Sequence, residues 1–509
     1  MPQNVHGARH EPSAGPPRAI RVVDETGFRY ILKNTAIIAT FACRFLLQTR
    51  SHTRLSRRMT GDDMVNWIKG YFLAWFAVVA AGLSFSPDAA AVPAFARQTG
   101  LACVACHVSF PELTPFGRFF KLTAYTLSNK WTIPLAGMVQ VSQTNTRSIN
   151  NANYDFVRNQ DVVLQQASLF YGGRIAGPVG AFAQWTYDGI AHHSGIDNTD
   201  IRAAGHYTRN DIDFIYGVTV NNNPTVSDVW NTTPAFGFPY ASSSVSVAPI
   251  AGTLIDGGLA QQVAGIAAYA FWNRSIYAEF GFYRTADQMF SVFRTGQDIS
   301  TPGGVKRLKG ANPYWRLAYN REFGPHSLEV GTFGMIADVY PDNTIPSSPT
   351  DRFTDFGVDA QYQYLTLSHA FTTQIAFIHE KQDWSASFPS GGIGAGPTPS
   401  NPTDHLNTLK LKASYYYQRK YGTTLAYFST TGNQDTGLYG AVPVTGSANG
   451  LPDTRGIILE LDYLPLPQVK LSVQYTWFLK FNGARFNYDG SGRNASDNNT
   501  LYLLAWLIF

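Results

Sequence analysis

One short run of the sequence carries the residue types that redox chemistry needs. It reads Cys103-Val104-Ala105-Cys106-His107, two cysteines three positions apart with a histidine directly after the second. In a C-x-x-C-H run the two thiols add across the vinyl groups of a haem, and the imidazole that follows binds the iron. The spacing therefore predicts one covalent haem c, held by Cys103 and Cys106, with His107 as an axial ligand.

Two other interpretations of the cysteine pair fit the sequence less well. A thioredoxin-like redox pair is expected within a βαβ pattern, and none surrounds this run. A tetrahedral zinc site would need a second C-x-x-C, and the remaining cysteine is Cys43, far towards the N-terminus.

The sequence does not choose the second axial ligand of the haem iron. Met138 is the nearest candidate in sequence, although it falls in an expected strand. The other candidates are equally well explained as surface or lumen residues: Met289, Met335, His192, His193, His206, His326, His369, His379 and His405. The distal ligand therefore stays open.

Residues 59–91 have the features of a secretory signal peptide. The apolar stretch 71–85 follows Lys69, precedes three alanines ending at Ala91, and falls short of the roughly 20 residues of a membrane-spanning helix. We expect cleavage after Ala91 rather than a membrane anchor. The polar residues 1–58 indicate a misassigned start or an extended leader.

Residues 92–130, which hold the haem motif, are too few to enclose a porphyrin. Segments of about 40 residues usually need a metal, a staple or a partner to fold. A haem has two large apolar faces, so the missing cover must come from the rest of the chain.

Composition is typical of a membrane β-barrel. Charged residues make up 15% of the chain, against about 25% in ordinary soluble proteins, and aromatic residues make up 14%. The mean hydropathy of −0.13 is too low for a helical membrane protein. The aromatic content excludes disorder, and the near-neutral balance of residues 92–509 gives no reason to expect nucleic-acid binding.

Residues 131–509 alternate apolar and polar side chains with the period of two that marks strands. The run 469–480 is the clearest example, with apolar side chains at every odd position. Sixteen strands are expected, beginning near residues 133, 161, 178, 199, 211, 260, 274, 312, 325, 353, 368, 404, 421, 456, 468 and 499. Short turns alternate with long connections, the outer-membrane pattern. The predicted fold is all-β, a 16-stranded antiparallel transmembrane barrel, porin-like, with a short α-helical haem segment before it.

Further features bear on the placement of this barrel in a bacterial outer membrane. An even number of strands places both barrel ends in the periplasm, and the terminal Phe509 resembles the assembly signal of outer-membrane proteins. The longest connection, near 222–259, is the third outer loop. Either it folds inward, constricting the lumen or shielding the haem, or it is a solvated surface loop.

The motif and its surroundings resemble a known family. The residues that carry the likeness are 102–107, Phe110-Pro111-Glu112-Leu113-Thr114-Pro115-Phe116-Gly117-Arg118, Lys121-Leu122, 222–225 and 230–234. Together with the order of signal, haem motif and barrel, they resemble the fused monohaem cytochrome c–porins of the bacterial outer membrane, whose best-known members oxidise iron. The leader 1–58 departs from that pattern.

The resemblance implies that electrons enter from an extracellular donor, ferrous iron in the best-known members, and leave through the haem to a periplasmic c-type cytochrome. The family is wider than iron oxidisers, so neither the donor nor Fe(II) oxidase activity follows from the match. Arg118 and Lys121 are candidate contacts for the haem propionates, or else exposed charges on a short helix.

Two rival functions remain to be weighed against electron transfer. The alternative is a substrate diffusion porin whose haem is structural or sensory, and a steady pore through the lumen would favour it. A haem peroxidase would need a distal acid–base pair, for which the sequence has no local motif.

Overall fold

The computed structural model describes residues 94–128, 132–148, 156, 158–210, 212–236, 238, 240–294 and 298–509. The predicted leader 1–58 and signal peptide 59–91 lie outside these residues. Within the described part, residues 94–128 precede a barrel that takes up the rest.

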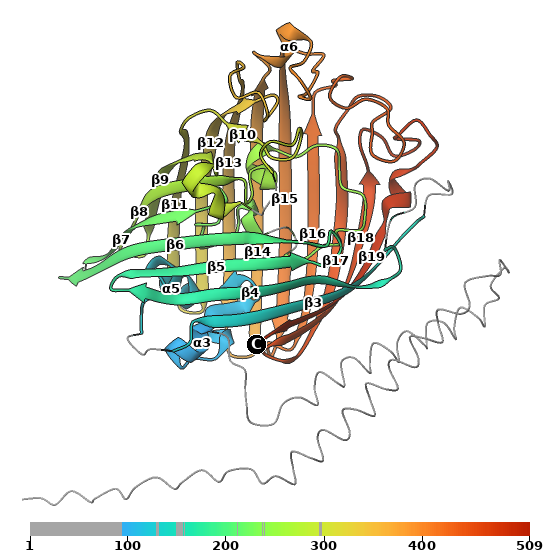
Figure 1. Cartoon of the computed structure of the whole chain (residues 1–509). Helices are drawn as coiled ribbons and strands as arrows, with labels where there is room; N and C mark the ends of the chain where they lie inside the picture. Colours follow the sequence, from blue (N-terminus) through green and yellow to red (C-terminus); the bar gives the residue numbers. More distant parts are fainter. Residues whose placement is uncertain are drawn as a thin grey trace, which may run out of the picture. The chain divides into compact units, whose positions relative to one another are not determined.

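The barrel is one closed antiparallel sheet (Figure 1). Seventeen strands join it, and β10 (Arg307–Leu308) is a two-residue addition beside β12, so sixteen strands form the wall. The wall strands are β3 (Leu135–Thr146), β4 (Val162–Ala176), β5 (Val179–Asp188), β6 (His193–Arg209), β7 (Ile212–Asn221), β8 (Val263–Trp272), β9 (Ile276–Thr285), β11 (Asn312–Phe323), β12 (His326–Tyr340), β13 (Asp351–Leu365), β14 (His369–Asp383), β15 (Thr403–Tyr417), β16 (Tyr421–Gly432), β17 (Thr454–Leu466), β18 (Val469–Lys480) and β19 (Thr500–Ile508). The predicted fold and strand number are confirmed.

One predicted connection is wrong. The sequence suggested a long outer loop near 188–199, but β6 begins at His193 and residues 189–192 alone join it to β5. The Asp188 side chain closes this tight turn by accepting the backbone N–H groups of Ile190 (2.7 Å) and Ala191 (2.9 Å). Because the aspartate side chain satisfies the backbone N–H groups of the turn, four residues are enough to connect the two strands.

The wall strands turn apolar side chains outward and polar side chains inward. Leu425, Ile266 and Phe280 are 57%, 56% and 54% exposed, whereas Thr219 and Glu329 on the inner face are at most 1% exposed. An apolar exterior around a polar interior is the reverse of a soluble protein, and it suits strands with lipid on one side and a polar lumen on the other. No helix in the described ranges is long and apolar enough to cross a bilayer.

The lipid-facing exterior makes a quantitative prediction on β16. Leu425→Arg places a charge in the middle of the strand's outer face and is expected to cost about 2–4 kcal/mol of folding stability in lipid vesicles. Thr431→Arg, on the same face near the strand end, is the matched control and should cost about 0–1 kcal/mol. Equal costs in urea titrations of the refolded barrel would mean that this face does not lie in hydrocarbon.

The two rims of the barrel differ. The short turns, such as 324–325 and 418–420, lie at one rim, and both ends of the wall lie there too. In Figure 1 the C-terminus and helix α3 (Ala94–Thr99) mark this rim, and α6 (Ser387–Ser390) marks the other, which carries the long loops. Those loops also hold the helical turns η1 (Pro234–Phe236), η2 (Leu254–Gly258), η3 (Gln288–Phe293) and η4 (Ala495–Asn498).

The C-terminal strand closes the barrel against the first wall strand. Ile508 in β19 lies opposite Met138 in β3, and Gly137 and Phe509 exchange both backbone hydrogen bonds, at 2.6 and 2.9 Å. Closure leaves no strand edge to meet lipid. Sixteen lipid-compatible strands closed in this way make the chain an outer-membrane β-barrel with both barrel ends at the short-turn, periplasmic rim.

Candidate functional site: a plug inside the barrel

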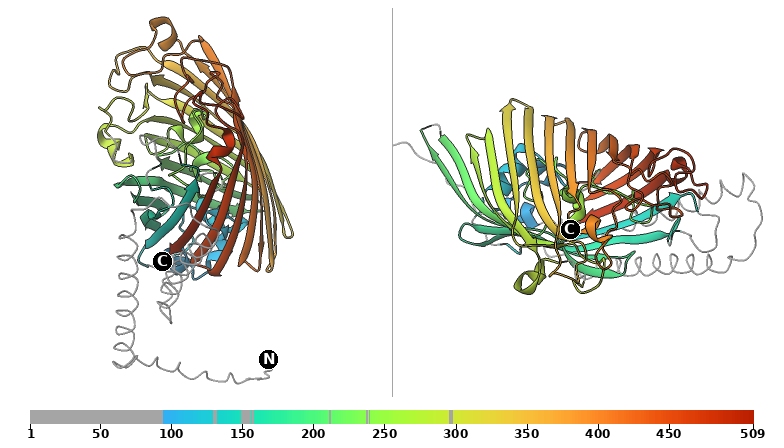
Figure 2. Two further views of the ribbon diagram at one scale, coloured as in Figure 1. Left: turned by 90° about the vertical axis from the view of Figure 1, so that its right-hand side faces the viewer. Right: turned by 90° about the horizontal axis from the view of Figure 1, so that it is seen from above.

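Residues 94–128, here called the plug, fold into three short helices and a small hairpin. They are α3 (Ala94–Thr99), α4 (Cys103–Cys106), β1 (His107–Ser109), β2 (Glu112–Leu113) and α5 (Pro115–Leu122). The view from above in Figure 2 shows these blue segments enclosed by the strands. The structure therefore places the C-x-x-C-H run at the periplasmic end of the lumen, where it is partly buried and Val104 is exposed.

Thr114 determines where α5 begins and holds this helix close to the haem motif. Its hydroxyl accepts the Gly117 N–H at 3.2 Å and donates to the Ala105 carbonyl at 2.5 Å. Pro115 follows as the first helical residue, where proline suits the fixed backbone angle. The same threonine thus caps α5 and joins it to α4.

Gly117 lets α5 approach the haem motif closely. A β-carbon at this position would lie 2.2 Å from the Cys106 carbonyl oxygen. Only glycine provides that space without moving the backbone. The residue is part of the run that carries the family resemblance, and this contact is its physical role here.

A cavity of about 310 Å³ separates the plug from the wall. Cys106 and His107 border it from the plug, and Met138 in β3 borders it from the wall. Apolar and aromatic side chains form most of the remaining boundary: Phe95, Phe110, Phe120, Phe170, Phe182, Trp506 and Ile508. This plug–wall cavity is concave and mostly apolar with a few polar groups, the usual character of a cofactor site.

His107 is suited to bind a metal as neutral imidazole. Burial lowers its pKa to about 4, so the ring carries no proton charge near neutral pH. Its Nδ1 atom is buried and has no hydrogen-bond partner among the described residues. The ring therefore fits the axial position predicted for it.

The two cysteines do not have the properties of a redox pair. Both are free thiols, and burial raises the pKa of Cys103 and raises that of Cys106 to about 11. Catalytic C-x-x-C cysteines have lowered pKa values instead. In the described part of the chain, no group of three or more His, Cys, Asp or Glu side chains could hold a metal ion. The residues present thus fit a haem better than zinc or disulfide exchange.

Cys103 lies on the other side of the motif from the plug–wall cavity. It borders a second cavity, of about 250 Å³, together with the short turn 418–420 and residues 464–467 at the end of β17. His107 and Phe110 border both cavities. The haem motif therefore stands between the barrel interior and the periplasmic rim.

Arg118 and Lys121 are buried against the wall, so their alternative assignment as exposed charges is wrong. Arg118 donates to Gln363 (2.7 Å) and Ser327 (2.6 Å), and Lys121 donates to the carbonyls of Val226 (2.5 Å) and Asp228 (3.0 Å). Burial lowers the pKa of Lys121 to about 8. Lys121 borders the plug–wall cavity and Arg118 does not, so a propionate contact stays a prediction that the geometry favours for Lys121.

Of the ten candidate distal ligands, Met138 is the one that borders the plug–wall cavity. Met289 is 81% exposed, and Met335 is buried in a separate core cluster around Phe333. The seven histidines do not border this cavity: His192, His193, His206, His326, His369, His379 and His405.

The third outer loop folds into the lumen, which settles the choice between an inward and a solvated loop for its first part. Residues 222–233 are all buried, and Asp228, Trp230 and Val229 are at most 1% exposed. Asn231 donates to the Pro111 carbonyl of the plug at 3.0 Å. The loop thus constricts the lumen and contacts the plug beyond the haem motif.

A buried ion cluster that the sequence did not reveal holds this loop against the wall. Arg316 in β11 pairs with Asp228 of the loop (3.0 Å), Glu329 in β12 (3.1 Å) and Asp359 in β13 (2.8 Å). All four side chains are completely buried. The period-two alternation of a strand does not show which carboxylates will meet an inward-facing arginine such as Arg316.

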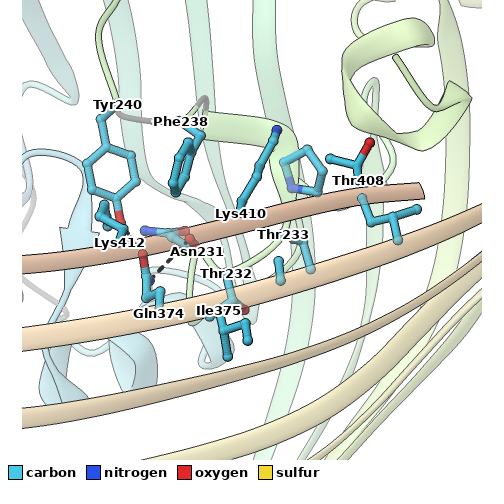
Figure 3. Close-up of a pocket in the computed structure, with 13 residues that line it drawn as sticks. Asn231, Thr232, Thr233, Phe238, Tyr240, Gln374, Ile375, Thr408, Lys410 and Lys412 are labelled. Atoms are coloured by element: carbon cyan, nitrogen blue, oxygen red, sulfur yellow. Dashed lines mark hydrogen bonds between the residues drawn. The ribbon is translucent and has the colours of Figure 1, made fainter. Parts of the chain in front are cut away.

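Tyr240 borders both the plug–wall cavity and a small pocket on its other side, which Figure 3 shows. Its hydroxyl lies 3.4 Å from Glu112 of the plug, and the Lys412 ammonium lies 3.5 Å from the ring centre. The space beside it, bordered also by Phe238 and Lys410, is only about 20 Å³. That volume is close to the minimum for one water molecule, so the space beside Tyr240 does not itself hold a larger solute.

Polar contacts join the plug to widely separated parts of the wall. They are Tyr125 to Asp200 in β6 (2.9 Å), Tyr269 in β8 to the Leu122 carbonyl (2.7 Å), Arg118 to Gln363 in β13 (2.7 Å) and Lys412 in β15 to Glu112 (3.4 Å). Contacts on so many strands mean that the plug lies across the lumen rather than along one side of it.

Comparison with known proteins finds outer-membrane channels at low similarity. The outer-membrane channel DcaP of Acinetobacter baumannii is 11% identical with a TM-score of 0.41, covering 74% of this chain and 96% of that one. OmpT of Vibrio cholerae is 10% identical with a TM-score of 0.39, covering 75% of this chain and 99% of that one. An anion-selective porin from Comamonas acidovorans is 13% identical with a TM-score of 0.39, covering 74% of this chain and 98% of that one. No family model and no curated protein matches the chain. The assignment as an outer-membrane barrel rests on the wall itself.

Proposed function

We propose that this barrel transfers electrons across the outer membrane, from an extracellular donor to a periplasmic c-type cytochrome, through one haem c held by the plug. The observation that carries the proposal is the position of His107, on an apolar cavity inside a barrel whose lumen the plug and loop 222–233 fill. The family resemblance makes ferrous iron the expected donor.

The chain's own residues have definite tasks in this proposal. Cys103 and Cys106 would anchor the haem, and His107 would hold its iron. A bound haem supplies a reversible one-electron couple. The aromatic side chains at the plug–wall cavity would cover the apolar faces of the haem, and the plug and the buried loop 222–233 occupy the lumen through which a donor would otherwise pass.

The diffusion porin is the second candidate, and the barrel fold itself favours it. A closed wall of sixteen strands usually surrounds an aqueous lumen. The plug and the inward-folded loop 222–233 argue against steady passage of solutes, but a plug that moves aside would restore a pore. Solute conductance is therefore the measurement that separates the two functions.

The test combines haem spectra with conductance on the same preparation. Outer-membrane fractions from cells that mature c-type haem should show a haem that becomes reduced when ferrous iron is added outside. Purified barrels in planar bilayers should show little steady conductance. A haem that other reductants reduce but iron does not would overturn the choice of donor, whereas a colourless barrel with a large steady pore would establish the porin.

A further inference from the structure

We infer that the barrel wall, not the plug, completes the coordination of the haem iron, with the Met138 sulfur as distal ligand. The inference rests on the proposed function, because it assumes a haem attached at Cys103 and Cys106. Its evidence is the cavity that has His107 on one side and Met138 on the other.

Met138 is placed by barrel closure. It lies in β3 opposite Ile508 of β19 on one side and Ser168 of β4 on the other. Its side chain is 4% exposed and packs with Phe110, Phe170 and Trp506, all of which border the same cavity. Neighbouring strands on both sides therefore hold the side chain inside the lumen, beside the haem motif.

The sulfur of Met138 is not committed to another strong interaction. The nearest donor is the Gln140 side-chain amide, 3.8 Å away, which is a weak contact to a thioether. A thioether is a soft, neutral ligand that suits haem iron and can be buried without the cost of burying a charge. Methionine is also flexible enough to reach an iron across an irregular cavity.

The other side chains at this cavity that could bind iron already have partners. Lys121 donates to two loop carbonyls, Tyr125 donates to Asp200 at 2.9 Å, and Tyr240 lies against Glu112 and Lys412. Binding iron would require each of them to leave a buried polar partner unsatisfied, which is costly. Met138 can change partners without that loss.

A ligand from the wall would make the coordination of the haem iron depend on the assembly of the barrel. The plug supplies one axial ligand and β3 the other, so full coordination would form only when the plug is seated in a closed barrel. Methionine as the partner of histidine also raises the reduction potential relative to two imidazoles. Electron entry from an outside donor would then depend on correct assembly.

The test compares three variants of the full haem-loaded chain by spectroscopy. Wild-type protein should show, in the ferric state, the weak red absorption band of a thioether bound to haem. Met138→Leu should lose this band while keeping its covalent haem content. Met138→His should replace it with the spectrum of two imidazoles and lower the midpoint potential. Met335→Leu, a buried methionine in another cluster, is the control and should retain the band.

The outcomes separate this inference from the proposed function. Covalent haem without the red band in wild-type protein, or a band that survives in Met138→Leu, overturns the distal ligand and leaves the proposed function intact. Wild-type barrels without covalent haem overturn both. Loss of the band in Met335→Leu as well would point to disturbed packing and count against Met138.

Discussion

The double variant Cys103→Ala/Cys106→Ala is expected to carry no covalently attached haem. Each thioether bond needs one of these thiols, and Cys103 and Cys106 are the two cysteines after the predicted cleavage site. Loss should therefore be complete rather than partial. Haem staining of denatured protein, with the absorption of the alkaline pyridine complex of the haem, measures it directly.

A matched control must show that the barrel still assembles. Ser109→Ala, two residues beyond the motif, removes a buried hydroxyl without touching a thiol and should keep its haem. In the double variant, the heat-sensitive gel mobility of a folded barrel should be unchanged, because both cysteines belong to the plug and no wall strand contains them. Full haem content without the two thiols would contradict covalent attachment at this motif.

The wall of this protein was predictable because lipid imposes a simple pattern on it. Strands such as β18 place every second side chain in hydrocarbon, so the period of two is visible over the whole strand. Most predicted strand starts lie within three residues of the observed ones, and β6 is the exception. The start of that strand was predicted too late, near residue 199 instead of His193, because Asp188 closes a tight turn locally, which alternation does not indicate.

The contents of the lumen were less predictable. The motif located Cys103, Cys106 and His107, since attachment chemistry fixes their spacing. Nearness along the chain was the one reason to consider Met138, because its spatial relation to His107 depends on the closure of β19 against β3. Contacts of this kind join residues that are distant along the chain, so no local pattern in the sequence indicates them.

The burial of Arg118 and Lys121 has the same explanation. A short helix such as α5 is usually amphipathic, with its charges in water. Here the lumen surrounds the helix, and both charges meet polar wall and loop atoms instead. A sequence shows that a side chain is charged, but the topology decides whether it meets water or a buried partner.

Arg316→Met is expected to be the most destabilising single substitution in the lumen. It leaves three buried carboxylates, Asp228, Glu329 and Asp359, without the cation that pairs with all of them. Removing one partner from a buried ion pair typically costs about 3–5 kcal/mol. Urea unfolding of the refolded barrel should show this loss, and loop 222–233 should become sensitive to protease because its anchor at Asp228 is gone.

Two further arginine variants make the result specific to the buried cluster. Arg352→Met removes a guanidinium that is 56% exposed and pairs with Asp338 at 2.8 Å; an exposed pair should cost no more than about 1 kcal/mol. Arg316→Lys keeps the charge but cannot reach three carboxylates at once, because the bidentate contact with Asp359 needs a planar guanidinium. It should therefore lie between wild type and Arg316→Met. A loop that stays protected in Arg316→Met would show that hydrogen bonds such as Asn231 to Pro111, rather than the ion cluster, hold it in the lumen.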